Sequence, residues 1–358
     1  MFGEVYNSCF LIGFSVFVIS LLTSLLFIPL VWKISINNGF IALPNSRSSH
    51  NEIVPNTGGI LLFFAILIPY LLFSKISFNN NFFLVLLSFL SLFIVGVLDD
   101  IKNVNVKFKL IGQFIPALFL IFSLHDQNLV IPFVSWSEEI PRLLKLVFWI
   151  LVIVGIVNAY NFIDGIDGLA IGMGALGGIL FGVYFYTTGY CNLSILALCL
   201  SGGLIGLLKQ NISKRRKIFI GDTGSLIIGG IISLLILRHL EINARTDLNF
   251  SSSMIFGILF IPVSDLIRVV IMRLINGNSP FKADRTHIHH IIMDSYKLNH
   301  IQTSLILVAT QLVIFFIFLG YNKIFEKGQL IFSLFMFGLY FIYLARTEKS
   351  IAKARYSS

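Results

Sequence analysis

Long apolar segments alternate with short polar ones along the whole chain. Each apolar segment is close to the roughly 20 residues that a helix needs to cross the hydrocarbon core of a bilayer. We therefore predict an all-α, polytopic integral membrane protein with about eleven transmembrane helices. These cover residues 9–32, 58–73, 82–98, 108–124, 143–159, 169–187, 191–208, 222–240, 253–272, 303–320 and 330–345.

No soluble domain, low-complexity tract or internal repeat interrupts this series, so residues 1–358 are interpreted as a single membrane-embedded domain. The composition agrees, because 56% of the residues are hydrophobic and the mean hydropathy is +0.90. Such a chain has too little polar surface to cover a water-soluble globule. Cys9, Cys191 and Cys199 lie in or beside predicted helices and are interpreted as small apolar residues, without a disulfide.

The distribution of Lys and Arg sets the predicted orientation, because basic residues accumulate in the cytoplasmic loops of membrane proteins. With the N-terminus outside and the C-terminus in the cytoplasm, most of the 26 Lys and Arg residues fall on the inner side. The net charge of +9 then follows from topology and an anionic substrate, and requires no nucleic acid. The polar loops expected on the inner side are 33–57, 99–107, 158–168, 209–221 and 273–302.

Asp99 and Asp100 end an apolar helix in the stretch GVLDDIK. Two adjacent carboxylates at a membrane boundary repel one another and are costly unless a cation or a proton compensates them. A divalent metal ion is one explanation for the pair. A polar helix end with a solvated loop behind it is the other.

The stretch NAYNFIDGIDGLA spaces Asn158, Asn161, Asp164 and Asp167 three residues apart, directly after an apolar run. Residues at this spacing are neighbours at a helix end. Their amides and carboxylates can hydrogen-bond sugar hydroxyls, a base edge or metal-bound water, whereas solvating a polar loop so close to lipid is expensive. The stretch lacks the other oxygen ligands and the terminal Glu of a calcium loop.

Asp222 stands in RRKIFIGDTGS, where the eighth predicted helix begins. An Asp at this point can simply cap the helix. The basic run 214–217 and the unobstructed backbone N–H groups of the helix start favour a bound phosphate instead.

Three histidines, His287, His289 and His290, lie close together beside Arg285. Zinc is a competing interpretation, but no Cys is near, and the carboxylates on the same side favour an oxygen-binding ion such as Mg²⁺ or Mn²⁺. The histidines are therefore interpreted as phosphate ligands or proton donors, with a purely structural cluster as the alternative. The first inner loop adds a fifth polar group on this side, which contains Arg47 and His50.

In chain order, the stretches PNSRSSH, LDD, NAYNFIDGIDGLA, FIGDTGS and SPFKADRTHIHH resemble those of the polyprenyl-phosphate N-acetylhexosamine-1-phosphate transferases, over nearly the whole chain. The resemblance is closer to the bacterial undecaprenyl-phosphate GlcNAc-1-phosphate transferases of glycosyltransferase family 4 than to the peptidoglycan-precursor translocase. It implies a multi-pass enzyme of the bacterial inner (cytoplasmic) membrane. Such an enzyme transfers a sugar-1-phosphate, with GlcNAc-1-phosphate as the first expectation, from a UDP-N-acetylhexosamine to undecaprenyl phosphate and releases UMP. The reaction would start a lipid-linked glycan such as O-antigen, capsule or a teichoic-type polymer.

The resemblance also implies roles for individual residues. Asp222 would bind Mg²⁺ (or Mn²⁺) together with Asp99 and Asp100, and one of the two adjacent carboxylates is a candidate base. The three histidines would hold the pyrophosphate with help from Arg285, and Phe219 would stack on uracil. The full set expected to bind substrates is Asn158, Asn161, Asp164, Asp167, Phe219, Arg268, Arg285, Arg47 and His50.

Alternatives stay open at this point. The RSSH loop also resembles relatives that take modified sugars, so UDP-FucNAc or UDP-QuiNAc are alternative donors. Direct attack and a covalent aspartyl-phosphate are both compatible with the sequence. A polytopic transporter of an anionic solute is the rival from another class, although transporters usually hold their polar residues near the bilayer midplane and contain repeats. A homodimer is neither required nor excluded.

Overall fold

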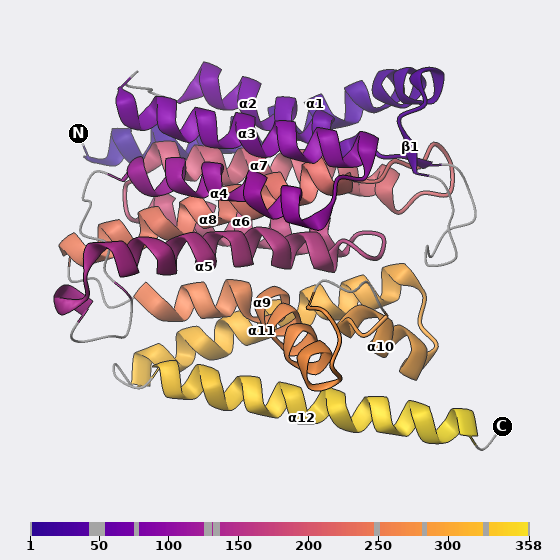
Figure 1. Cartoon of the computed structure of the whole chain (residues 1–358). Coiled ribbons are helices and arrows are strands. Elements are labelled where there is room, and N and C mark those ends of the chain that lie inside the picture. Colours follow the sequence, from indigo (N-terminus) through magenta and orange to yellow (C-terminus); the bar gives the residue numbers. More distant parts are fainter. Residues whose placement is uncertain are drawn as a thin grey trace.

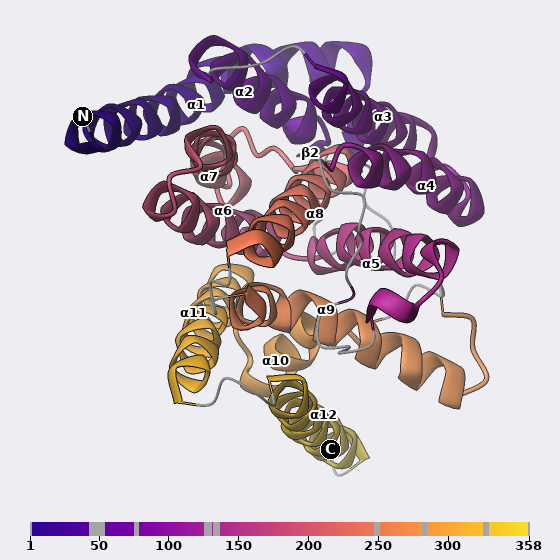
Figure 2. The ribbon, with the colours of Figure 1, turned by 90° about the vertical axis from the view of Figure 1, so that its left-hand side faces the viewer.

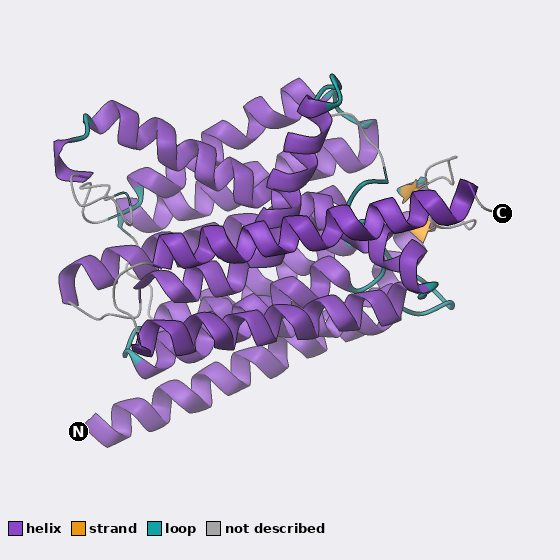
Figure 3. Cartoon of the chain, turned by 90° about the horizontal axis from the view of Figure 1, so that it is seen from below, coloured by secondary structure: helices purple, strands orange, loops and turns teal. Residues whose placement is uncertain are grey.

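The structure, a computed structural model, describes residues 2–42, 54–74, 79–124, 131, 137–246, 251–280, 285–324 and 329–356. Nearly all of this part is helical, and most helices run along one common direction (Figure 1). The N- and C-termini lie at opposite ends of the bundle, as Figure 3 also shows from below. The elements are α1 (Phe2–Asn38), β1 (Ile41–Ala42), β2 (Val54–Pro55), α2 (Gly58–Phe73), α3 (Asn80–Lys102), α4 (Val106–Phe122), the 3₁₀ helix η1 (Ser137–Glu139), α5 (Arg142–Ile163), α6 (Leu169–Thr187), α7 (Cys191–Asn211), α8 (Gly221–Thr246), α9 (Ser251–Ile275), α10 (Ile288–Tyr296), α11 (His300–Ile324) and α12 (Gln329–Tyr356).

Each of the eleven predicted apolar segments forms a helix, and most of these helices continue for several residues beyond the apolar core. Eight helices in the described part of the chain are long and apolar enough to cross a membrane, and the protein is thus a multi-pass membrane protein. The exact number of eleven spans and the orientation of the termini remain predictions. Three features were not predicted: the 3₁₀ helix η1, the short helix α10 inside the polar loop 273–302, and an antiparallel β1–β2 ladder that pairs Ile41 with Pro55.

The turn between α3 and α4 brings the acidic end of α3 against the start of α4. Asn103 ends α3 in a left-handed conformation with φ 48°, and its N–H donates to the carbonyl of Asp99 at 2.8 Å. The side chain of Asn105 then caps α4 by accepting from the N–H of Lys107 at 3.0 Å. Because the turn is this tight, Lys109 in the first turns of α4 faces Asp99.

Helix α8 lies in the middle of the bundle, between α6 and α7 on one side and α3, α4 and α5 on the other (Figure 2). Its first turn packs against α2 and α3 at backbone contact. A Cβ atom added at Gly59 would lie 2.1 Å from the backbone N of Gly224, and one added at Gly96 would lie 2.4 Å from the Cα of Thr223. Only glycine permits this approach, which fixes the start of α8 beside the end of α3.

Cys9 of α1 and Cys191 of α7 form a disulfide, with Cα atoms 5.9 Å apart. The prediction that no cysteine forms a disulfide is therefore wrong for this pair. Packing of α1 on α7 joins residues 182 positions apart, and no local pattern in the sequence indicates such a pairing. Cys199 is free and buried, as predicted.

Candidate functional site

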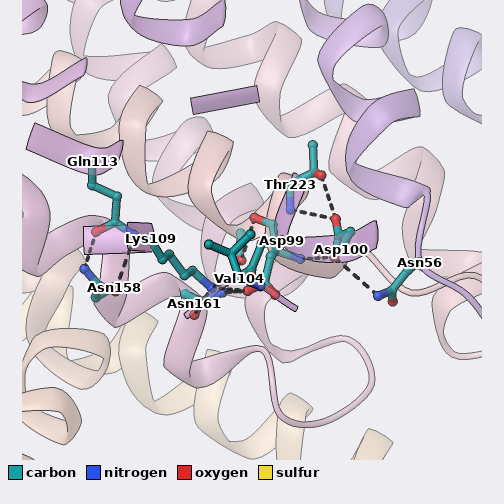
Figure 4. Close-up of polar contacts among 11 residues, drawn as sticks. Asn56, Asp99, Asp100, Val104, Lys109, Gln113, Asn158, Asn161 and Thr223 are labelled. Carbon is teal, nitrogen blue, oxygen red and sulfur yellow. Dashed lines mark hydrogen bonds and ion pairs between the residues drawn. The ribbon is translucent and has the colours of Figure 1, made fainter. Parts of the chain in front are cut away.

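Four helix ends bring their polar side chains together around the ammonium group of Lys109 (Figure 4). The Nζ atom of Lys109 lies 2.7 Å from Oδ2 of Asp99, 2.5 Å from Oδ1 of Asp222 and 3.2 Å from Oδ1 of Asn161. Asn161 also donates to the carboxylate of Asp222, and to Oγ of Ser225 at 2.8 Å. We call Asp99, Asp222, Asn161 and Lys109 the carboxylate cluster. It combines three residues that the sequence predicted with a lysine that it did not single out.

Asp100 contacts different groups from Asp99, although both residues lie at the end of α3. Its carboxylate accepts from the backbone N–H of Asp222 at 2.8 Å, from the N–H of Thr223 at 2.9 Å and from the Thr223 hydroxyl at 2.6 Å. The side chain of Asn56 donates to it at 3.3 Å. Asp100 therefore caps α8, where its negative charge also meets the positive end of the helix.

The capping of α8 corrects the expectation that its first N–H groups are free to bind a phosphate. Both N–H groups that follow Gly221 already donate to Asp100. Gly221 has φ +67°, and a Cβ there would lie 2.6 Å from Oδ1 of Asp100. The carboxylate thus occupies the position that a phosphate oxygen would take at a free helix start.

Asn158 lies one helix turn from Asn161 but does not join the carboxylate cluster. Its Nδ2 donates to Oε1 of Gln113 at 2.6 Å and to the carbonyl of Val154 at 2.7 Å. The Nε2 atom of Gln113, a residue that is almost fully buried, lies 3.5 Å from Oδ1 of Asn158. The pair joins α4 to α5 and holds Lys109 of α4 beside Asn161 of α5, as Figure 4 shows.

The loop after α5 carries two aspartates in different electrostatic settings. Asp164 is partly buried, and this burial together with the charges of Asp222 and Asp100 raises its pKa well above the usual value. Burial alone would also raise the pKa of Asp167, but His300 and Lys217 outweigh it and hold that pKa below the usual value. Asn161, three residues before Asp164, belongs to the carboxylate cluster, so this loop begins beside the cluster.

Asp167 connects that loop to two other elements. Its Oδ2 lies 2.6 Å from Nζ of Lys217 and 3.2 Å from Nδ1 of His300. The Nζ of Lys217 also lies 5.1 Å from the centre of the Phe219 ring. Phe219 is held in place by its backbone, which pairs with Pro55 and Gly58. Asp167, Lys217 and Phe219 thus form a second polar group next to the loop.

The three histidines begin α10 and are positioned by α9. The carboxylate of Asp265, which is fully buried, accepts from Nδ1 of His287 at 2.8 Å and from the N–H of Ile288 at 2.9 Å. Arg268 lies 3.1 Å from the same carboxylate and donates to the carbonyl of Thr286. Arg268 therefore holds the histidine segment from α9, rather than reaching the carboxylate cluster itself.

His289 and His290 are held in their neutral forms. Burial and the neighbouring histidines His290 and His287 lower the pKa of His289 well below its usual value. Burial and the charge of Arg285 lower the pKa of His290 to about 4. A Cβ atom at Gly165 would lie 2.3 Å from Nε2 of His289, so the histidine ring lies directly on the loop that carries Asp164.

The structure thus brings Asp99, Asp164, Asp222 and His289 to one end of the bundle, because Asp99 and Asp222 share Lys109 and His289 lies on the loop that carries Asp164. The β1–β2 ladder, which Figure 1 shows at one end of the bundle, is at this end, since Asn56 next to β2 donates to Asp100. Arg285 is half-exposed and pairs with Asp294 at 3.7 Å. The other two expected substrate-binding residues, Arg47 and His50, lie outside the described residues.

Lys109 and Asp265 are among the residues of the site that the sequence did not single out. A signal for Asp265 is present, because Asp265 and Arg268 are ionisable residues one turn apart inside an apolar helix, where charge is costly and is usually paired. The sequence gives no such signal for Lys109, because Lys109 is one of several lysines that follow the end of a predicted helix.

The carboxylate cluster fits a divalent cation by the chemistry of its oxygen atoms. Two carboxylate oxygens and one amide oxygen already converge on a positive charge, the Lys109 ammonium. No group of three or more His, Cys, Asp or Glu side chains is arranged as a metal site within the described ranges. Magnesium commonly uses only one or two carboxylates and completes its coordination with water and substrate phosphates, so this smaller set of ligands suits it.

Comparisons with known proteins give independent findings. A family model described as "Glycosyl transferase family 4" matches residues 82–239. The chain is 30% identical over 331 residues to the "Probable undecaprenyl-phosphate N-acetylglucosaminyl 1-phosphate transferase" of Bacillus subtilis (strain 168), which covers 92% of this chain and 89% of that protein. It is 29% identical to the "Undecaprenyl-phosphate alpha-N-acetylglucosaminyl 1-phosphate transferase" of Yersinia pestis, over 76% of this chain and 74% of that protein. The protein of the same name in Escherichia coli (strain K12) is 27% identical, over 75% and 73%.

Proposed function

The chain belongs to glycosyl transferase family 4, and from this premise we propose that it transfers a sugar-1-phosphate from a UDP-sugar to undecaprenyl phosphate and releases UMP. The names of its relatives give N-acetylglucosamine as their sugar, and UDP-GlcNAc is the donor we propose for this chain. The proposed location is the bacterial inner membrane. The observation that carries the proposal is the convergence of Asp99, Asp222 and Asn161 on one positive charge.

The proposed reaction joins two phosphates. An oxygen of the lipid phosphate attacks the phosphorus that bears the sugar, the bond from this phosphorus to the UMP oxygen breaks, and UMP leaves. A dissociated lipid phosphate has no proton to lose, so the chain's main task is to hold two anionic substrates in line. Asp99 is suited to positioning, because Val104 N–H and Lys109 fix both of its oxygens at 2.8 and 2.7 Å.

Asp99, Asp222 and Asn161 are the residues that would hold magnesium. Bound there, the ion would supply positive charge against the pyrophosphate and the leaving UMP. The protein supplies further positive charge through Lys109 and, at the edge of the site, Lys217. Such fixed charges lower the energy of the charge that develops as the bond to UMP breaks.

The nucleotide end of the donor is assigned to the group formed by Asp167, Lys217 and Phe219. An aromatic ring next to a cation can receive a planar base and a phosphate together. The loop with Asp164 lies between this group and the carboxylate cluster, where its polar atoms are available to sugar hydroxyls. The neutral His289 and His290 lie beyond this loop and are proposed to hydrogen-bond the pyrophosphate.

An apolar cavity supports a polyprenyl acceptor. It has a volume of about 540 Å³ and lies between α5, α8, α9 and α12, with Trp149, Phe260 and Phe337 in its lining. Its lining is almost entirely hydrocarbon, which suits an isoprenoid chain and not a sugar. Ser264 of α9, next to Asp265, also lines the cavity, so it extends toward the histidine segment.

The test is release of UMP by the purified protein in detergent with undecaprenyl phosphate and Mg²⁺. UDP-GlcNAc, UDP-FucNAc and UDP-QuiNAc are compared as donors. We expect Asp222→Asn to reduce turnover at least about 100-fold, because it removes charge from the metal site and from the Lys109 contact. Glu139→Gln is the control, since it neutralises an exposed carboxylate in η1, outside the cluster, and should keep wild-type turnover. A folded protein that releases no UMP from any donor would contradict the proposal.

A further inference from the structure

The ammonium of Lys109 occupies the point on which the oxygens of Asp99, Asp222 and Asn161 converge. Its three contacts, at 2.7, 2.5 and 3.2 Å, involve one oxygen from each of three different helices. Only about an eighth of the Lys109 side chain is exposed, so the ammonium is held inside the site. A small divalent cation prefers the same kind of oxygen atoms.

We propose that Lys109 and the divalent cation bind in this place one at a time, so that Lys109 leaves the three oxygens when the cation binds. The inference deepens the proposed function, because it treats the same cluster as the metal site. Two cations at this separation would repel strongly in a partly buried site, while the oxygens gain more from a doubly charged ion than from an ammonium. Exchange is therefore the favoured arrangement.

The exchange gives Lys109 two tasks. Without metal, its charge compensates Asp99 and Asp222, which would otherwise repel each other across the contact between α3 and α8. With metal bound, the flexible four-carbon side chain carries the released ammonium toward the space in front of the cluster, where the substrate phosphates arrive. The carboxylate of Asp164, in the loop after α5, also feels the charge of Lys109, whereas Gln113, one turn deeper on α4, is a neutral amide that pairs with Asn158.

The first experiment measures binding of Mn²⁺, without nucleotide or lipid, to the purified full-length protein. Lys109→Met removes the competing charge and keeps a side chain of similar length, so we expect Mn²⁺ to bind at least about tenfold more tightly than to the wild type. Lys107→Met is the control, because it removes an exposed lysine from the same helix start and should change the affinity less than about twofold. The proposal is overturned if Lys109→Met binds Mn²⁺ no more tightly than Lys107→Met, or if neither protein binds it.

A second measurement uses the wild type and does not depend on the folding of a variant. An amine-acylating reagent labels exposed lysines, and mass spectrometry gives the extent of labelling at Lys109 and Lys107. We expect Mg²⁺ to increase labelling of Lys109 several-fold and to leave Lys107 unchanged. Equal or lower labelling of Lys109 with Mg²⁺ would overturn the exchange.

Both measurements are made without substrates, so their outcome is separate from that of the UMP assay. A protein that releases UMP but shows no change in metal affinity or labelling contradicts only the exchange. A protein that exchanges Lys109 for metal but releases no UMP supports the exchange and contradicts the proposed donor and acceptor.

Discussion

Asp99 and Asp100 are adjacent in the sequence and point to different partners. Asp99 faces Lys109, whereas Asp100 accepts from the first N–H groups of α8. Neither explanation considered for the pair describes Asp100, which caps α8, and the explanation as a metal ligand stays a prediction for Asp99. Because Asp100 caps α8 rather than its own helix, its carboxylate has a structural role. The carboxylate of Asp99 is available for chemistry.

Replacing Asp by Asn should mainly lower stability at Asp100 and mainly lower the rate of UMP release at Asp99. Asp100→Asn weakens the cap of α8 and should lower the free energy of unfolding by about 1 to 2 kcal/mol. Asp99→Asn should leave the stability close to that of the wild type and reduce UMP release at least about tenfold. Thermal unfolding in detergent and the UMP assay, run on both variants, check the prediction. Equal loss of stability in the two variants would contradict the assignment of the cap.

The neutral histidines make stability depend on pH. The pKa of His290 is about 4 in the folded protein, below its usual value near 6.5, because of burial and Arg285. Below pH 6.5 the unfolded chain binds a proton that the folded protein does not, so stability is present above pH 6.5 and is lost as the pH falls toward 4. His289 acts in the same direction.

We therefore expect the melting temperature of the wild type to fall between pH 6.5 and pH 4.5. His290→Gln should fall less over the same interval, because the glutamine cannot be protonated. Thermal unfolding at steps of one pH unit measures both curves. Parallel curves for the two proteins would show that His290 does not contribute.

At the scale of elements, the position of the site depends on how closely α8 approaches α2 and α3. Glycine at Gly59 and Gly96 lets backbone lie on backbone, and this contact puts Asp100 within reach of the α8 amides. The sequence predicted all three helices from their hydrophobicity. The sequence could not predict the contact between these helices, because a glycine that faces lipid and a glycine that faces another backbone occur in the same kind of apolar segment.

Gly96→Ala tests this contact. Its Cβ would lie 2.4 Å from the Cα of Thr223, so α3 and α8 must move apart, and we expect a loss of about 1 to 3 kcal/mol in stability together with loss of UMP release. Gly320→Ala in α11 is the matched control, because nothing lies within 4 Å of its added Cβ. Alanine there should be neutral or stabilising by up to about 1 kcal/mol. Similar melting temperatures for the two variants would contradict the role given to Gly96.

At the scale of the whole molecule, the sequence predicted the positions of the long helices well, because a membrane requires each of them to be apolar over a fixed length. It missed α10, a helix of 9 residues in a polar loop, where no such requirement applies. It placed Asp99, Asp222 and Asn161 together through their motifs. The sequence did not indicate the role of Lys109, because Lys109 and Asp222 are 113 residues apart and come into contact only in the folded bundle.

The capped start of α8 has a consequence for how this protein handles anions. Many nucleotide-binding proteins bind phosphate with main-chain N–H groups, which every substitution except proline leaves in place. Here Asp100 already accepts from those amides, so in the proposed reaction lysine, histidine and metal would have to hold the pyrophosphate. A single substitution can replace the lysine or the histidine, and the ionic composition of the medium can change the metal. The selectivity for the donor can therefore change in small steps.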